Sequence, residues 1–313
     1  MLAFIVRRLI STILVMGVVA VLIFLLLRLS PGDPVAILVG DNASPAQIEA
    51  VRQQLGLDDP MIVQFWAWAS KVLVGDLGIS IFSNEPVAKL IAQRLEPTLS
   101  LTATTIVFAV LIAVAMGVIA AWKVGTWVDR LVMALSVLGF SVPVFVVGYV
   151  LIYIFAIELR WLPVQGYRPI GDGVWQWARH LVLPSIALGL AYIALIARIT
   201  RTAMLDALAE DYVRTARAKG VSTGVVLTKH ALKNAGVPIV TVIGIGVALL
   251  IGGVVITETV FNIPGIGRLV VDAIQTRDYP IIQGVILLFS GIYVIVNLMV
   301  DLTYSLLDPR IRT

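Results

Sequence analysis

The sequence contains no cysteine and only two histidines among its 313 residues. The lack of cysteine excludes disulfide bonds, thiolate nucleophiles and thiolate metal sites. The histidines, His180 and His230, lie apart in the sequence, near the ends of apolar stretches, and two isolated imidazoles make a poor metal site. We therefore expect neither a bound metal nor thiol chemistry.

Charged side chains are also scarce. They make up 13% of the residues, against 59% hydrophobic residues, and the mean hydropathy is +1.00. Soluble proteins keep roughly a quarter of their residues charged, so a soluble core could not bury this much apolar surface. Several stretches reach the ~18 apolar residues typical of a membrane span. The sequence predicts an all-α polytopic membrane protein.

The net charge of +4 does not indicate nucleic acid binding. No basic tail or aromatic-interleaved basic patch is present, and in a membrane protein positive charge reports topology first. The N-terminal apolar stretch continues to Leu29, which is longer than the core of a signal peptide. We interpret it as an uncleaved first span.

Six apolar stretches match the length of about 20 residues that a spanning helix needs. Lys and Arg gather at the two termini and in the short loops that follow the second and fourth stretches, so these parts are expected in the cytoplasm. Both termini are then cytoplasmic. The predicted spans are Leu9–Leu29, Leu99–Trp122, Leu131–Phe155, Leu181–Ile199, Val237–Ile256 and Ile281–Leu302.

These stretches divide the chain into three parts. Residues 1–29 hold the first span, residues 30–96 form a helical extracytoplasmic segment, and residues 97–313 form the core with spans two to six. The middle segment is either a structural cap on the outer mouth or a docking surface for an external partner.

Three helices are expected in the extracytoplasmic segment. Ser44 and Pro45 are typical of a helix start. Pro60 opens a second helix whose aromatic side chains favour the membrane interface. Pro86 opens a third helix, which we expect Pro97 to end.

Polar and helix-breaking residues interrupt the third span at Gly139–Pro143. A proline in a span frees a backbone carbonyl, so this segment is either a kink for packing or part of a water-filled path. The fifth span carries several glycines, which let helices approach closely. The candidate pathway residues are Ser141, Pro143, Thr241 and Gly244.

Charged side chains within the predicted spans are few. The best candidate for a charge inside the membrane is Asp301, near the inner end of the last span. Self-powered transporters usually place carboxylates or ion-binding backbone at the membrane midplane. Intramembrane proteases need a Ser–His pair or two aspartates at depth. Both classes are therefore disfavoured.

A dense charged segment, "DYVRTARAKG", lies between the fourth and fifth spans on the expected cytoplasmic side. Its acid at the start and base at the end agree with a helix dipole, and Gly220 allows a sharp turn. Its apolar side chains are too small to anchor a membrane-surface helix. A short helix seated in a protein groove or a solvated connector remain as alternatives.

This segment begins the stretch "DYVRTARAKGVSTGVVLTKHALKNA", which resembles the EAA-type loop of ABC transporter permeases in the dipeptide/oligopeptide/nickel branch. Arg214-Thr215-Ala216 and Gly220 occupy the Glu-Ala-Ala…Gly positions, and Leu232-Lys233-Asn234 replaces the usual Leu-Pro, as is typical of this branch. The stretches "GDLGISIFSNEPVAKLIAQRLEPTLSL", "ETVFNIPGIGRLVVDAIQTRDYPIIQG" and "LLDPRIR" resemble the same branch, in the same order. One local departure is Glu96, within "RLEPTL".

The resemblance is to a B-type permease and implies a type I ABC importer fold in a bacterial inner membrane. It implies three kinds of partner: a second, C-type permease, two ATP-binding cassette subunits or domains, and an extracytoplasmic peptide-binding protein. Short peptides are the implied substrate, and nickel or another small solute is the alternative. The chain itself is not expected to be an enzyme or to bind a cofactor, because it has no GxxxxGK[ST] loop, so ATP and Mg would belong to the partner ATPase.

The resemblance also implies site residues. The loop 206–235 would carry the coupling helix, and the outer loop 258–280 would contribute to docking of the binding protein together with residues 30–96. The coupling residues are expected to be Glu210, Asp211, Tyr212, Arg214, Thr215, Ala216, Arg217, Ala218, Lys219 and Gly220. The docking residues are expected to be Asp76, Phe261, Asn262 and Arg268.

Overall fold

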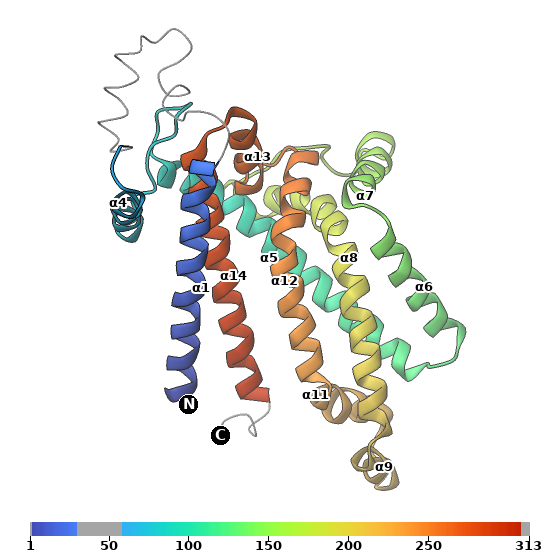
Figure 1. Ribbon diagram of the computed structural model, residues 1–313. Coiled ribbons are helices and arrows are strands. Elements are labelled where there is room, and N and C mark those ends of the chain that lie inside the picture. The colour runs from blue at the N-terminus through green and yellow to red at the C-terminus, as the bar shows by residue number, and fades with distance from the viewer. Residues whose placement is uncertain (1, 30–57, 308–313) are drawn as a thin grey trace. The chain divides into compact units, whose positions relative to one another are not determined.

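The computed structural model describes residues 2–29 and 58–307, and these residues are almost entirely helical (Figure 1). The β-structure of this part of the chain is an isolated antiparallel bridge between Ile79 and Pro86. The all-α prediction is therefore confirmed for the described residues. The helix expected to start at Ser44 lies outside them.

The chain forms two compact units, which are described separately. The larger unit contains Leu95–Arg268 and the C-terminal part of the last helix, from Ile295 onward. The smaller unit contains the described residues of Leu2–Arg94 together with Leu269–Val294. Residues 269–294 thus group with the N-terminal part rather than with the rest of the expected core.

The smaller unit is built around α1 (Leu2–Leu29) and α4 (Met61–Leu73). The ring of Phe24 meets the ring of Phe65 edge-on, with 5.3 Å between centroids, and also packs against Trp68. Phe65 and Trp68 of α4 therefore pack on α1, whereas Trp66 is exposed. The other helices that contribute to this unit are the start of α5 (Val87–Trp122), the end of α13 (Ile266–Thr276) and the start of α14 (Tyr279–Leu307).

The larger unit is organised around α8 (Val174–Ala209), which packs against several other elements. Its buried positions include many small residues, among them Ala187, Ala194 and Ala197, which allow neighbouring helices to approach closely. Its partners include α6 (Trp127–Ser141), α7 (Val144–Leu151), which continues as the π-helix Ile152–Glu158, and α12 (Gly236–Val260).

Three helices are long and apolar enough to cross a membrane: Val87–Trp122, Val174–Ala209 and Tyr279–Asp301. Two bent helix pairs raise this number to five if each pair is one span, and the apolar part of α1, Ile10–Leu25, is shorter. All these counts concern the described residues. Five of the six predicted stretches lie within single helices, whereas the third is broken, with a bend of 103° between α6 and the helix that starts at Val144.

The expectation that Pro97 ends a helix is wrong, because α5 continues through it to Trp122. A proline removes the hydrogen bond to the carbonyl four residues earlier, here that of Gln93. Gln93 is exposed, so water can satisfy that carbonyl, while Pro97 itself and Leu101 are buried. Tertiary packing on both sides of the proline thus outweighs the lost bond.

Candidate functional site

The charged segment after α8 forms a short helix, as predicted. The long helix α8 ends at Ala209, Glu210 is extended, and α9 covers Asp211–Ala218. Gly220 has φ +75°, a conformation that glycine adopts without strain, and it turns the chain toward the next helical segment. That segment consists of α10 (Thr223–Val225), the π-helix Val226–Ala231 and α11 (Leu232–Asn234).

One face of α9 is buried inside the chain itself. Val213 is completely buried and Ala216 is 7% exposed, and both pack against Val226. Leu208 and Val221 complete this small cluster. The side chain of Ala216 is thus covered by the returning segment, and its expected coupling role stays a prediction.

The opposite face of α9 is exposed and carries charges of both signs. Asp211 and Arg214 form an ion pair at 3.2 Å, and both side chains are highly exposed, so the pair contributes little to stability. Thr215 donates a hydrogen bond to the Asp211 carbonyl at 3.0 Å. The expected coupling residues that are exposed are Glu210, Asp211, Tyr212, Arg214, Thr215, Arg217, Ala218, Lys219 and Gly220.

A groove of about 310 Å³ lies beside α9, where α8, α11 and α12 come together. The Tyr212 hydroxyl donates to the Ala207 carbonyl at 3.2 Å at its wall. Asp206 and Glu210, one helical turn apart, contribute two carboxylates that form no ion pair with the described residues. Asp206 and Asn234 were missed from sequence, although the Asp206–Glu210 spacing is visible there. The groove is lined by Ala203, Asp206, Ala207, Glu210, Tyr212, Asn234, Ala235 and Pro238.

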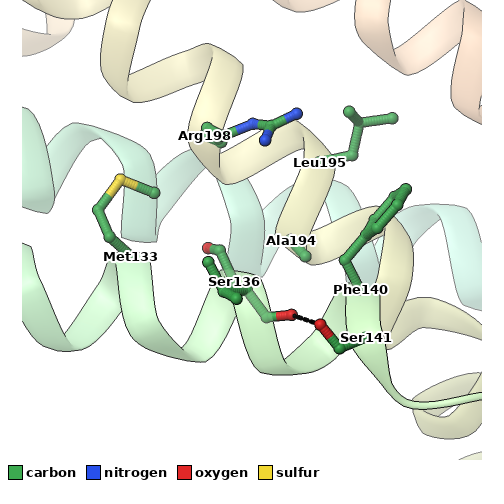
Figure 2. Close-up of a pocket in the computed structure, with 8 residues that line it drawn as sticks. Met133, Ser136, Phe140, Ser141, Ala194, Leu195 and Arg198 are labelled. Carbon is green, nitrogen blue, oxygen red and sulfur yellow. Dashed lines mark hydrogen bonds between the residues drawn. The ribbon is translucent and has the colours of Figure 1, made fainter.

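A second cavity of about 300 Å³ lies between α6 and α8 (Figure 2). Ser141, a predicted pathway residue, lines it from the end of α6, and Arg198 lines it from α8. The Ser141 hydroxyl donates to the Val137 carbonyl at 2.8 Å. Arg198 was not predicted as a pathway residue, because in the sequence it is one of several positive charges at the ends of the predicted spans. The lining residues are Met133, Ser136, Val137, Phe140, Ser141, Ala194, Leu195 and Arg198.

The other predicted pathway residues do not line this cavity. Pro143 is exposed and directly precedes α7. Thr241 donates to the Val237 carbonyl at 2.8 Å, and a side chain on Gly244 would lie 2.3 Å from Val300. The environment of Gly244 supports the packing interpretation, and a pathway role for Thr241 and Gly244 stays a prediction.

The loop after α12, which is expected on the outer side of the membrane, is held by a buried acidic side chain. Glu258 is completely buried and accepts a hydrogen bond from the Thr98 hydroxyl at 2.6 Å. Its other oxygen accepts from the Arg268 backbone N–H at 2.9 Å. Thr98 in turn accepts from the Ile266 N–H at 2.8 Å. These bonds fix the loop on α5 within the larger unit.

The four expected docking residues differ in exposure. Phe261 is only 2% exposed and belongs to the hydrophobic core, and its expected docking role stays a prediction. Asn262 is exposed and accepts a hydrogen bond from the half-buried Arg268. Asp76, in the smaller unit, is exposed and accepts from the Gly78 N–H at 2.9 Å. A docking role for these three residues stays a prediction.

Glu96, the departure from the family pattern, has a structural role. Its Oε1 accepts hydrogen bonds from the Tyr167 hydroxyl and the Ile170 N–H, each at 3.0 Å. Burial raises the pKa of Tyr167 above its usual value, so the phenol stays protonated and can donate. Glu96 thus fastens the loop between the π-helix and α8 to α5.

Comparison with known proteins places this architecture in a transporter family. Residues 113–313 match the family described as "Binding-protein-dependent transport system inner membrane component", and residues 1–102 match its N-terminal companion. The chain is 59% identical over 309 residues to a probable peptide ABC transporter permease, y4tP, of Sinorhizobium fredii, covering 99% of each chain. It is 47% identical to the glutathione transport system permease GsiC of Escherichia coli (strain K12), covering 100% of this chain and 99% of the relative.

A solved structure of the MetNI methionine ABC transporter, in an inward-facing conformation, shares the fold with a TM-score of 0.58. The match covers 70% of this chain and 96% of that one at 18% sequence identity. The family model covers more than half of the chain, and the curated relatives match along nearly all of it. This protein belongs to the binding-protein-dependent transport system inner membrane components, the permease subunits of ABC importers.

Proposed function

We propose that this chain is one of two permease subunits that together form the translocation pathway of an importer for short peptides. The observation that carries the proposal is the 59% identity, over 99% of both chains, to a protein named as a peptide ABC transporter permease. The second relative is named for glutathione, which is itself a tripeptide. A short peptide is the substrate class common to both names.

We further propose that α9 is the coupling helix, which receives force from a partner ATPase through its exposed face. The packing of the loop supports this role. Val213 and Ala216 fix α9 to the returning segment, and Leu227 and Ala231 of that segment pack against Met204 in α8. A displacement of α9 would therefore be transmitted to the long helix α8 rather than absorbed by a flexible loop.

The complete transporter would contain this chain, a second C-type permease, two ATP-binding cassette subunits or domains and an extracytoplasmic peptide-binding protein. ATP and Mg would be bound by the ATPase partners, and this chain would bind no cofactor. Its six spans would leave both termini in the cytoplasm. The same machinery importing nickel or another small solute is the alternative proposal, and a self-powered carrier is a remote one.

The proposal is tested by purifying the chain with its partners and measuring uptake in proteoliposomes. The expected result is ATP-dependent uptake of labelled di- and tripeptides, with no uptake when the permease chain is reconstituted alone. Uptake of nickel but not of peptides would favour the alternative substrate. Uptake by this chain without any ATPase would overturn the proposed function.

A further inference from the structure

The break between α6 and α7 leaves backbone carbonyl groups without helical partners. Pro143 has no N–H group, so it cannot bond to the carbonyl of Gly139 one turn earlier. Within the described part of the chain, the carbonyls of Gly139, Phe140 and Ser141 accept no backbone hydrogen bond from residues beyond the break. These polar groups need another partner.

The broken segment is also exposed, with Phe140 at 67%. It lies in the middle of the apolar stretch Leu131–Phe155, at the expected depth of the membrane core. Unsatisfied carbonyl groups in lipid are costly, so irregular backbone at this depth occurs only against protein or a water-filled cavity. This face is therefore covered by protein or lines water, and a cavity that opens on it favours water.

The cavity between α6 and α8 opens on the same segment, because Phe140 and Ser141 line it (Figure 2). Arg198 is exposed there, and its guanidinium forms no ion pair or hydrogen bond with the described residues. Arg201, three residues later, is by contrast paired with Asp129 at 2.5 Å. An isolated guanidinium in a mainly apolar cavity is suited to bind a carboxylate, because its donors match the two oxygen atoms.

The α6 side of the cavity offers acceptors instead. The hydroxyl groups of Ser136 and Ser141 donate to the backbone carbonyls of Val132 and Val137, so their oxygen lone pairs remain available. The C-terminal end of α6 also carries the negative end of its helix dipole, which favours a cation. The cavity thus presents a cation on one helix and acceptors on the other.

We propose that this cavity is a transient substrate site on the pathway, in which Arg198 binds the C-terminal carboxylate of the peptide. Ser136, Ser141 and the end of α6 receive its ammonium group. A short peptide is a zwitterion, so it matches both sides of the cavity. The volume of about 300 Å³ is near the lower end of small-molecule sites, which suits a di- or tripeptide. The inference rests on the proposed function, because the substrate must be a short peptide.

The test uses the complete transporter in proteoliposomes of neutral lipid, with one labelled tripeptide and its C-terminal amide. Each peptide is supplied as saturated binding protein, so that selection by the binding protein is removed. Wild type should carry the free peptide about tenfold faster than the amide, a factor typical of a charge-assisted hydrogen bond. Arg198→Gln should remove this difference by slowing only the free peptide, and Arg198→Lys should keep part of it.

Arg130→Gln is the matched control, because Arg130 is exposed near the start of α6 and does not line the cavity. It should leave both uptake rates unchanged. Equal slowing of both peptides by Arg198→Gln would show a structural role and overturn the inference. Unchanged uptake rates in Arg198→Gln would show no role for this residue and would overturn it as well. An effect that appears only with anionic lipid would assign Arg198 to a lipid phosphate and would also overturn it. If wild type carries neither peptide, the proposed function itself fails.

Discussion

At the scale of single residues, Glu258 shows how a buried acidic side chain is made tolerable. Its carboxylate accepts from the Thr98 hydroxyl and from the Arg268 backbone, and both bonds lie within the larger unit. An ionised carboxylate buried without such partners would be strongly destabilising. The surrounding backbone must approach it closely, and Gly265 is the residue that permits this, because an added Cβ would lie 2.0 Å from Glu258 Oε1.

Gly265→Ala is therefore expected to destabilise the protein by roughly 1–3 kcal/mol or more, the usual effect of overpacking a filled site. The measurement is the melting temperature of the purified complex in detergent, monitored by fluorescence-detected size exclusion chromatography. Gly252→Ala is the control, because Gly252 has no atom within 4 Å of an added Cβ. Equal melting temperatures for the two variants would contradict the proposed role of Gly265.

The sequence alone did not reveal this cluster. The partner that requires Gly265 is Glu258, and Glu258 is fixed by Thr98, 160 positions away in the chain. A contact at that separation has no local periodicity, so a single sequence cannot show it.

At the scale of elements, local sequence predicts the bounds of α9 but not which of its faces is buried. Its start, its end and the turn at Gly220 follow from the helix dipole and from glycine geometry, and these predictions are confirmed. The choice of buried face depends on where the segment after Gly220 returns. Val226 of that segment covers Val213 and Ala216, so the face expected to meet a partner is partly an internal one.

Two alanines of α9, one on its buried face and one on its exposed face, allow a matched test of this packing. Ala216→Glu should disrupt the packing on Val226, because a buried carboxylate without a partner is costly. The loop should then be cut faster by trypsin in the isolated permease. Ala218→Glu, on the exposed face, should leave the loop resistant and weaken only co-purification with the ATPase. Equal protease sensitivity of the two variants would contradict the observed packing.

Pro97 and Pro143 show that one residue type can have opposite outcomes in two helices. At Pro97 the helix continues, because Leu101 is buried and the adjacent Thr98 is bonded to Glu258. At Pro143 the chain breaks, because Val142 is extended and α7 packs separately, with Gly148 close to the ring of Phe261. Local sequence identified both prolines, but the packing that decides each outcome is not local.

At the scale of the whole molecule, the number of apolar stretches follows from composition, but the number of crossings does not. The pair α6 and α7 is bent by 103°, so it is either one broken span or a re-entrant loop. The predicted topology requires a broken span, with residue 123 inside and residue 171 outside. The other arrangement would place both on the same side of the membrane.

The absence of native cysteine makes this choice measurable, because any introduced thiol is labelled without background. Gly171→Cys, Lys123→Cys and Thr215→Cys place single thiols at exposed positions before α8, before α6 and on α9. A membrane-impermeant maleimide should label Gly171→Cys in intact cells and the other two only after permeabilisation. Gly171 and Thr215 are separated by α8 alone, so they must differ if α8 crosses the membrane. Labelling of Lys123→Cys together with Gly171→Cys in intact cells would show a re-entrant loop, and would remove the pathway-facing break on which the role of Arg198 depends.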